Sequence, residues 1–164
     1  MIDDNIRLQI KGTLIHKSII LNSANKMFDY LVDNNQEKLA MELIERIIVH
    51  DNSKFTSEEL YGLAKIKNKK ALTDPNVLLS EEQQKLVELH WKNNRHHPEY
   101  FDDVSQMEEI DIIEMCCDWH ARSVQYNTDL LEFAKIRQEN RFHFPEDMYK
   151  KILKYCNVLL SQDQ

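Results

Sequence analysis

Glycine and proline are scarce in this chain of 164 residues, which contains only 2 and 3 of them. Folds that are rich in β-turns need both residues, whereas long helices tolerate their absence. Leucine, isoleucine, lysine and glutamate are abundant instead, and all except isoleucine are strong helix formers. The sequence therefore predicts an all-α protein, and its length matches one compact domain over residues 1–164.

The chain also lacks an excess of positive charge and any long apolar run. Its 28 acidic residues outnumber 21 basic ones, and the net charge of -7 argues against broad binding to nucleic acid or anionic membranes. No segment approaches the roughly 20 apolar residues that cross a bilayer. The first ten residues, MIDDNIRLQI, do not resemble a signal peptide. We expect a cytoplasmic protein that holds any anionic ligand in a local site.

A disulfide framework is absent as well. The three cysteines form no CxxC pair. Cys116 and Cys117 are neighbours in an expected helix, where a bond between them would be strained. This pattern favours a reducing compartment, in agreement with a cytoplasmic protein.

Apolar residues recur at helical spacing along most of the chain. Ser80 with Gln83 makes a capping box at one helix start, and Thr56 makes another with Glu59. The segment KNKKALTDPN, residues 67–76, is predicted to be an exposed loop. The pattern predicts six to seven helices, at about residues 6–31, 39–51, 56–66, 80–91, 105–124, 128–140 and 145–160.

A histidine and an aspartate stand at the end of the second expected helix. His50 and Asp51 continue its apolar stripes at steps of three and four residues, so both side chains are predicted to point inward. A buried carboxylate needs a cation, a basic side chain or a hydrogen-bond cluster. An isolated doublet is more often a helix end, with the histidine near the negative pole and the aspartate capping the next turn. The alternative that the adjacent histidine favours is a metal ion.

His16 lies on the apolar face of the first expected helix and is also predicted to point inward. Two inward histidines from separate helices, beside an inward aspartate, favour a metal site over a hydrogen-bonded core. Asp118 lies on a polar stripe of a later helix and either completes this set or pairs with Arg122 at the surface. Asp111 and Glu114 on the same stripe are its possible substitutes.

These residues resemble the HD superfamily of metal-dependent phosphohydrolases, in which one helix supplies a histidine, the next a His-Asp doublet and a later one an aspartate. His16, the doublet at 50–51 and Asp118 follow this order, at intervals of 34 residues (16 to 50) and 67 residues (51 to 118). The layout is similar to that of compact nucleotidase-type members over most of the chain. The segments HDNSKF, HHPE and EMCCDW are also similar to a small, largely uncharacterised family of bacterial and phage proteins. The resemblance implies an HD-type helical fold and a metal held by His16, His50, Asp51 and Asp118.

The segment HWKNNRHHPEYF adds three histidines and an arginine: His90, His96, His97 and Arg95. Resemblance to multi-histidine branches of the superfamily implies that the histidines bind a second metal, which Asp51 bridges. In those branches the third histidine and the HH pair stand farther apart than the six residues here, so the alternative is that these residues bind substrate phosphate. We expect a divalent transition metal (Mn, Fe, Co, Ni or Zn), with one tight ion and a weaker second site.

Such an ion lowers the pKa of bound water and polarises a phosphoryl oxygen. The expected function is therefore hydrolysis of a small nucleotide or related phosphoester. Asp51 and Lys54 are the expected catalytic residues, and Lys54 follows the doublet as in the HDxGK variants of the superfamily, where it can neutralise phosphate charge. Glu58 and Glu99 are candidates for proton transfer, and nothing in the sequence singles out either. The alternatives are a diiron oxygenase-type HD enzyme and a non-catalytic HD scaffold that binds a nucleotide or a partner protein.

Overall fold

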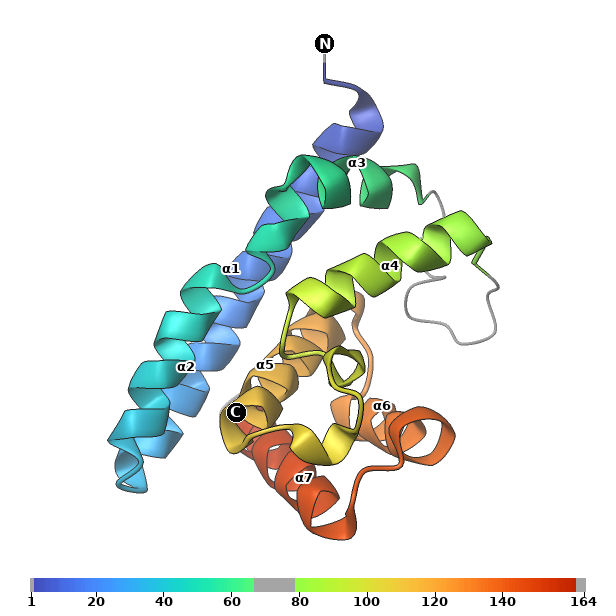
Figure 1. The fold of residues 1–164 in the computed structure, drawn as a ribbon. Coiled ribbons are helices and arrows are strands. Elements are labelled where there is room, and N and C mark those ends of the chain that lie inside the picture. The colour runs from blue at the N-terminus through green and yellow to red at the C-terminus, as the bar shows by residue number, and fades with distance from the viewer. Residues whose placement is uncertain (1, 67–78, 162–164) are drawn as a thin grey trace.

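The computed structural model describes residues 2–66 and 79–161, and these residues form helices and no strand (Figure 1). The segment KNKKALTDPN lies outside the described residues. The seven α-helices are α1 (Asp4–Asp33), α2 (Glu37–Val49), α3 (Ser57–Lys65), α4 (Glu81–Asn93), α5 (Glu109–Tyr126), α6 (Leu130–Arg137) and α7 (Glu146–Ser161). Shorter segments are the 3-10 turns η1 (Asn52–Phe55), η3 (Pro98–Tyr100) and η4 (Val104–Gln106) and the π-helical turn η5 (Gln138–Phe142). The prediction of an all-α domain with six to seven helices is confirmed. No helix among the described residues has the length and apolar character needed to cross a membrane.

Helices α1 and α2 form a long antiparallel pair (Figure 1). Asp3 caps α1, because its carboxylate accepts a hydrogen bond of 2.9 Å from the backbone N–H of Ile6. The chain reverses after α1 at Asn35, which adopts the left-handed conformation (φ 56°) that asparagine tolerates better than most residues. The buried side chains of α1 recur every three or four residues and include Ile6, Gln9, Thr13, His16, Ile20, Ala24, Met27 and Leu31.

Helix α5 runs through the centre of the molecule and contacts α1, α2, α6 and α7. Every residue from 110 to 121 is buried, polar ones included. Its start is set by a capping box between Glu108 and Asp111. The predicted start at Ser105 is therefore wrong by four residues, and Ser105 lies in η4 instead.

Two other helix ends differ from the prediction. Helix α2 ends at Val49, and His50 and Asp51 lie just beyond it, buried but not helical. Helix α6 begins after Asp129, whose side chain accepts a hydrogen bond from the backbone N–H of Glu132, and then changes into η5. The predicted single helix over 128–140 is therefore two elements.

The two predicted capping boxes have different outcomes. The one at Ser80 is confirmed, with both of its hydrogen bonds to Gln83 present. The one at Thr56 is wrong: its hydroxyl donates to the carbonyl of Ser53 at 2.7 Å, and Glu59 points to a histidine of another helix. The same capping-box pattern thus forms a local helix cap at Ser80, whereas at Thr56 its glutamate makes a contact between two helices.

The main hydrophobic core lies among α1, α2, α5, α6 and α7 and includes Ile20, Leu43, Ile113 and Ile152. A smaller cluster of Leu63, Ile66 and Val87 joins α3 to α4. The three cysteines are buried and unpaired.

Replacing Leu43 by alanine should destabilise the protein by about 2–5 kcal/mol, because this side chain has no exposed surface and its removal leaves a cavity in the main core. Urea denaturation followed by circular dichroism measures the change. The matched control is Met41→Ala, on the exposed side of the same helix, which should change the free energy of unfolding by no more than about 0.5 kcal/mol. Equal effects of the two substitutions would contradict this assignment of the core face.

Candidate metal centre

Four of the predicted ligands meet although they come from three separate segments. His16 lies on α1, His50 and Asp51 follow α2, and Asp118 lies on α5. One ligand atom from each of the four lies within 4.8 Å of the others. The Nε2 atom of His16 is 2.9 Å from Asp118 Oδ1 and 3.8 Å from Asp51 Oδ2. All four residues are buried.

A second set forms around the same aspartate. The ligand atoms of Asp51, His90, His96 and His97 also lie within 4.8 Å of one another. The Nε2 atom of His90 is 3.3 Å from Asp51 Oδ1 and 3.1 Å from His97 Nε2, while His96 Nε2 is 3.8 Å from Asp51 Oδ1. Six residues suffice for this convergence because the chain turns at Asn94, whose carbonyl accepts a hydrogen bond from the backbone N–H of His97.

The two carboxylate oxygens of Asp51 face different sets. Oδ2 lies toward His16 and His50, at 3.8 Å and 3.6 Å, whereas Oδ1 lies toward His90 and His96. A carboxylate with one oxygen in each of two ligand sets has the arrangement of a bridging ligand.

Several atoms of these sets are buried without a hydrogen-bond partner in the described part of the chain. Buried polar atoms nearly always have partners, so a group of orphans that face one another requires an explanation. The approach of His16 to Asp118 is close but lacks hydrogen-bond geometry. The four atoms concerned are His16 Nε2, His50 Nε2, Asp51 Oδ1 and His96 Nε2. A divalent cation would satisfy them, and the mixture of imidazole nitrogen and carboxylate oxygen suits such an ion. The residues present therefore fit a metal.

The backbone at Asp51 helps to direct its side chain inward. This residue adopts a left-handed conformation, with φ 58°, at the position after a helix end where glycine or asparagine is usual. Lys17 of α1 fastens the same turn by donating hydrogen bonds to the carbonyl of His50 and to Asn52 Oδ1. Lys54, in the following 3-10 turn, donates to Asp51 Oδ2.

Two buried glutamates orient the histidines from behind. Glu114 accepts from His50 Nδ1 at 2.9 Å and lies 3.4 Å from His96 Nδ1. Glu59 lies 2.9 Å from His90 Nδ1 and also accepts from Asn93 at 2.7 Å. A carboxylate that binds Nδ1–H leaves the Nε2 lone pair for a metal, and such outer contacts fix the ring orientation. Glu114 thus lies on the Nδ1 side of His50 and His96, with which it forms a third group of possible ligands, whereas Asp118 lies on the Nε2 side of His50.

The charges within the cluster stabilise one another. Burial alone would raise the pKa of Asp51, but the nearby Lys54 and His50 hold that pKa well below its usual range. Burial would lower the pKa of His50, but the surrounding carboxylates, Asp51 first among them, raise it to about 9. Burial would likewise raise the pKa of Asp118, but Arg122, His16 and His50 together hold that pKa well below its usual range. Without a metal, the cluster is held by ion pairs.

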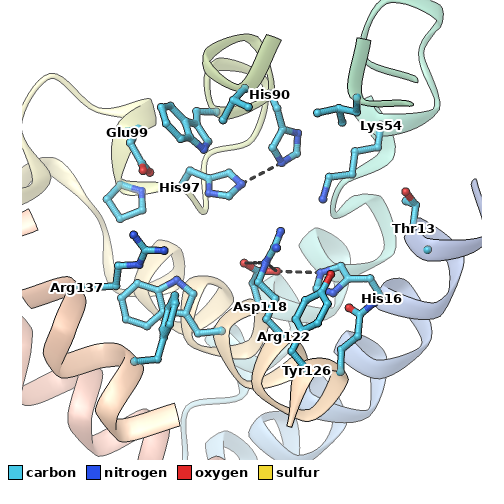
Figure 2. A pocket seen from close by; sticks show the side chains of 18 of the residues that line it. Thr13, His16, Lys54, His90, His97, Glu99, Asp118, Arg122, Tyr126 and Arg137 are labelled. Atoms are coloured by element: carbon cyan, nitrogen blue, oxygen red, sulfur yellow. Dashed lines mark hydrogen bonds and ion pairs between the residues drawn. The ribbon is translucent and has the colours of Figure 1, made fainter. Parts of the chain in front are cut away.

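The ligands open onto a cavity of about 200 Å³ (Figure 2). His16, Asp118, His90 and His97 line it, whereas His50 and His96 lie behind. Its lining also contains four basic residues, Lys54, Arg122, Arg137 and Arg141, and the aromatic residues Trp91, Trp119, Tyr126, Phe133 and Phe142. Figure 2 shows Lys54 and Arg137 on opposite sides.

Arg95 is not among the described residues that line the cavity, although the sequence suggested a phosphate ligand. Its guanidinium donates two hydrogen bonds to Asp111, at 2.8 Å and 3.1 Å, and fastens the turn after α4 to the start of α5. Asp111 also accepts from Arg46 at 2.6 Å. Neither Asp111 nor Arg95 is therefore placed to act on a ligand in the cavity.

Arg122, unlike Arg95, lies beside the candidate metal ligands. Its Nε atom lies 3.2 Å from Asp118 Oδ2, and its side chain lines the cavity. Of the two glutamates considered for proton transfer, Glu58 is exposed, whereas Glu99 lines the cavity and pairs with Arg141 at 2.5 Å.

A family model matches residues 7–158 and is described as a family of unknown function, DUF5662. The chain belongs to this family. No match was found among curated proteins or among solved structures. The relationship to the HD superfamily therefore stays a prediction.

Replacing Glu59 by glutamine should weaken binding of the second metal by about 10- to 100-fold, because His90 loses the carboxylate that orients its ring. Titration of Co²⁺ against a chelator of known affinity, followed by visible absorption, measures both sites. Glu58→Gln makes the same chemical change at the exposed neighbouring residue and should leave both affinities unaltered. If Glu59→Gln binds two ions as tightly as that control, the outer contact has no role in metal binding.

A triple variant that carries alanine at His90, His96 and His97 should retain about one metal per chain and lose the second. The remaining set of His16, His50, Asp51 and Asp118 is complete without them. Elemental analysis after gel filtration measures this stoichiometry. Complete loss of metal from a folded triple variant would overturn the division into a tight and a weaker site. In contrast, His50→Ala removes a ligand of the tighter site and should abolish metal retention.

Proposed function

We propose that this protein is a metal-dependent phosphohydrolase that acts on a small nucleotide or related phosphoester. The observation that carries the proposal is the position of Asp51, whose two oxygens serve two ligand sets beside a cavity with basic walls. Metal ligands alone suit many reactions. Cationic side chains in the same cavity favour a substrate with negative charge.

His16, His50, Asp51 and Asp118 would hold the tighter ion, and Asp51 with His90, His96 and His97 would hold the weaker one. When bound, such ions activate water and polarise a phosphoryl oxygen. Ligands of this kind suit Mn, Fe, Co, Ni or Zn.

The protein side chains then position the phosphate and offset its charge. Lys54 reaches the cluster from one side, and its contact with Asp51 keeps its ammonium group beside the shared carboxylate. Arg122 donates a hydrogen bond from Nε to Asp118 Oδ2, which fixes that edge of its guanidinium, and its side chain lies along the cavity wall. Two preorganised cations stabilise charge that develops on phosphate oxygens. Glu99 also lines the cavity, with a side chain that is 18% exposed, and burial raises its pKa, which suits a group that exchanges a proton with the leaving group.

A diiron oxygenase is the second candidate, because two ligand sets that share a carboxylate also suit a pair of iron ions. The basic walls of the cavity favour the phosphohydrolase, since an oxygenase has no general need of them. Oxygen consumption by the Fe²⁺-loaded protein, measured with an electrode over a panel of polyols and phosphonates, separates the two. Tight metal binding with neither reaction would favour a non-catalytic scaffold.

With Mn²⁺ or Co²⁺ added, the purified protein should hydrolyse small phosphoesters, and chelation should abolish the reaction. Asp51→Asn should reduce turnover to background because it removes the shared charge. Lys54→Gln should reduce kcat/KM by about 100-fold, as expected for loss of a charged group beside the transition state. Release of inorganic phosphate measures all three. Asp102→Asn, at an exposed position, is the control for Asp51→Asn. Turnover that survives both chelator and Asp51→Asn would contradict the proposal.

A further inference from the structure

The basic residues of the cavity extend beyond the metal ligands. Lys54 and Arg122 stand next to the ligand sets, but Arg137 and Arg141 come from α6 and η5, which contribute no metal ligand. In Figure 2 the guanidinium of Arg137 points into the cavity from the side opposite Lys54. A protein with 28 acidic and 21 basic residues therefore concentrates four cations in one small space.

The two outer arginines are held in place by their surroundings. Arg141 pairs with Glu99 and stacks on Trp91, with its guanidinium carbon 5.0 Å from the ring centroid. The guanidinium carbon of Arg137 lies 4.8 Å from the ring centroid of Phe133. Stacking of this kind fixes a guanidinium plane and leaves its edge to donate hydrogen bonds.

At this end of the cavity two arginines, Arg137 and Arg141, line the wall together with one carboxylate, Glu99. Arg137 is 9% exposed, and the charged groups that act on it include two arginines, Arg141 and Arg122, and one carboxylate, Glu99. Burial, and then Arg141, lowers the pKa of Arg137 from its usual value. An anion bound here would offset this repulsion.

We propose that the substrate carries a second anionic group, and that Arg137 and Arg141 bind this group while the phosphoester lies at the metal ligands. The inference rests on the proposed function and names the class of substrate more closely. A cavity of about 200 Å³ is smaller than the roughly 300–1,000 Å³ of common ligand pockets. The substrate class is therefore a compact phosphoester with a carboxylate or a second phosphate on the leaving group, such as a small bisphosphate or a phosphorylated acid.

A matched pair of compounds tests this proposal. Phenyl phosphate and 4-carboxyphenyl phosphate differ by one carboxylate, and the corresponding phosphonates are not hydrolysed. We expect the carboxylated member to be preferred at least about tenfold, both in kcat/KM of the phosphates and in affinity of the phosphonates for the Mn²⁺-loaded protein, because it gains charge-assisted hydrogen bonds. The preference should fall to about one in Arg141→Gln and in Arg137→Gln, and Arg137→Lys should restore part of it.

The control is Arg7→Gln, which removes one positive charge from the exposed surface of α1 and should keep the full preference. Metal content, measured by elemental analysis, should be the same in every variant, since neither arginine is a ligand. Arg141 has a side chain that is 36% exposed, so its variant should fold even if that of buried Arg137 does not.

The outcomes separate the two proposals. Equal affinity of wild-type protein for the two phosphonates, or an unchanged preference in both arginine variants, would overturn the second anion site and would mean that Arg137, Glu99 and Arg141 only close the cavity wall. Preference for the carboxylated phosphonate without hydrolysis of either phosphate would overturn the proposed function and leave the anion site standing.

Discussion

The carboxylate of Asp51 has no exposed surface, and basic side chains from four segments approach it. His16, His90 and His96 are distant from Asp51 in the sequence, whereas His50 and Lys54 belong to the same turn after α2. The position of this carboxylate therefore depends on α1, on α4 and on that turn together. The side chains concerned are His16, His50, Lys54, His90 and His96. A buried charge is costly without partners, and removal of a basic partner leaves part of this charge uncompensated. The geometry of the whole centre follows from the need to satisfy this carboxylate.

Local periodicity was enough to predict the inward histidines. His16 and the doublet at 50–51 extend apolar stripes, and the stripe rule depends only on neighbours three or four residues away. The same rule fails for Glu59 and Glu114, because glutamate on a helix is usually solvated and nothing nearby in the sequence marks these two as buried. Their partners lie 31 and 64 residues away. Only the packing of α3 against α4, and of α5 against α2, reveals them.

The choice between Arg95 and Arg122 shows the same limit. Arg95 stands beside the HH pair in the sequence, which suggests a shared ligand, but the turn at Asn94 sends it to the opposite side, onto Asp111. Arg122 was seen as a surface partner of Asp118. That pairing is present, and burial of Asp118 turns it into a contact beside the candidate metal ligands. The spacing of four residues therefore predicted the pairing of Arg122 with Asp118, but it did not predict that the pair is next to the metal ligands.

The distribution of charge also limits which anions can reach the centre. The chain as a whole is acidic, with a net charge of -7, whereas the cavity is lined by four basic residues and two acidic ones, Asp118 and Glu99. A long polyanion meets mostly the repulsive exterior, because its charges extend past the cavity. A small anion fits within the attractive region alone. Size and charge selection thus come from the same arrangement.

The left-handed backbone of Asp51 has a consequence for how members of this family can diverge. Glutamate would keep the charge but would strain this turn, whereas asparagine and glycine suit the turn and carry no charge. A lineage released from the need for metal could therefore change this position to asparagine or glycine with little backbone strain, because no residue there would have to supply the carboxylate that the two ligand sets share. Residue 51 is thus a marker by which relatives that keep an ion can be told from those that have become scaffolds.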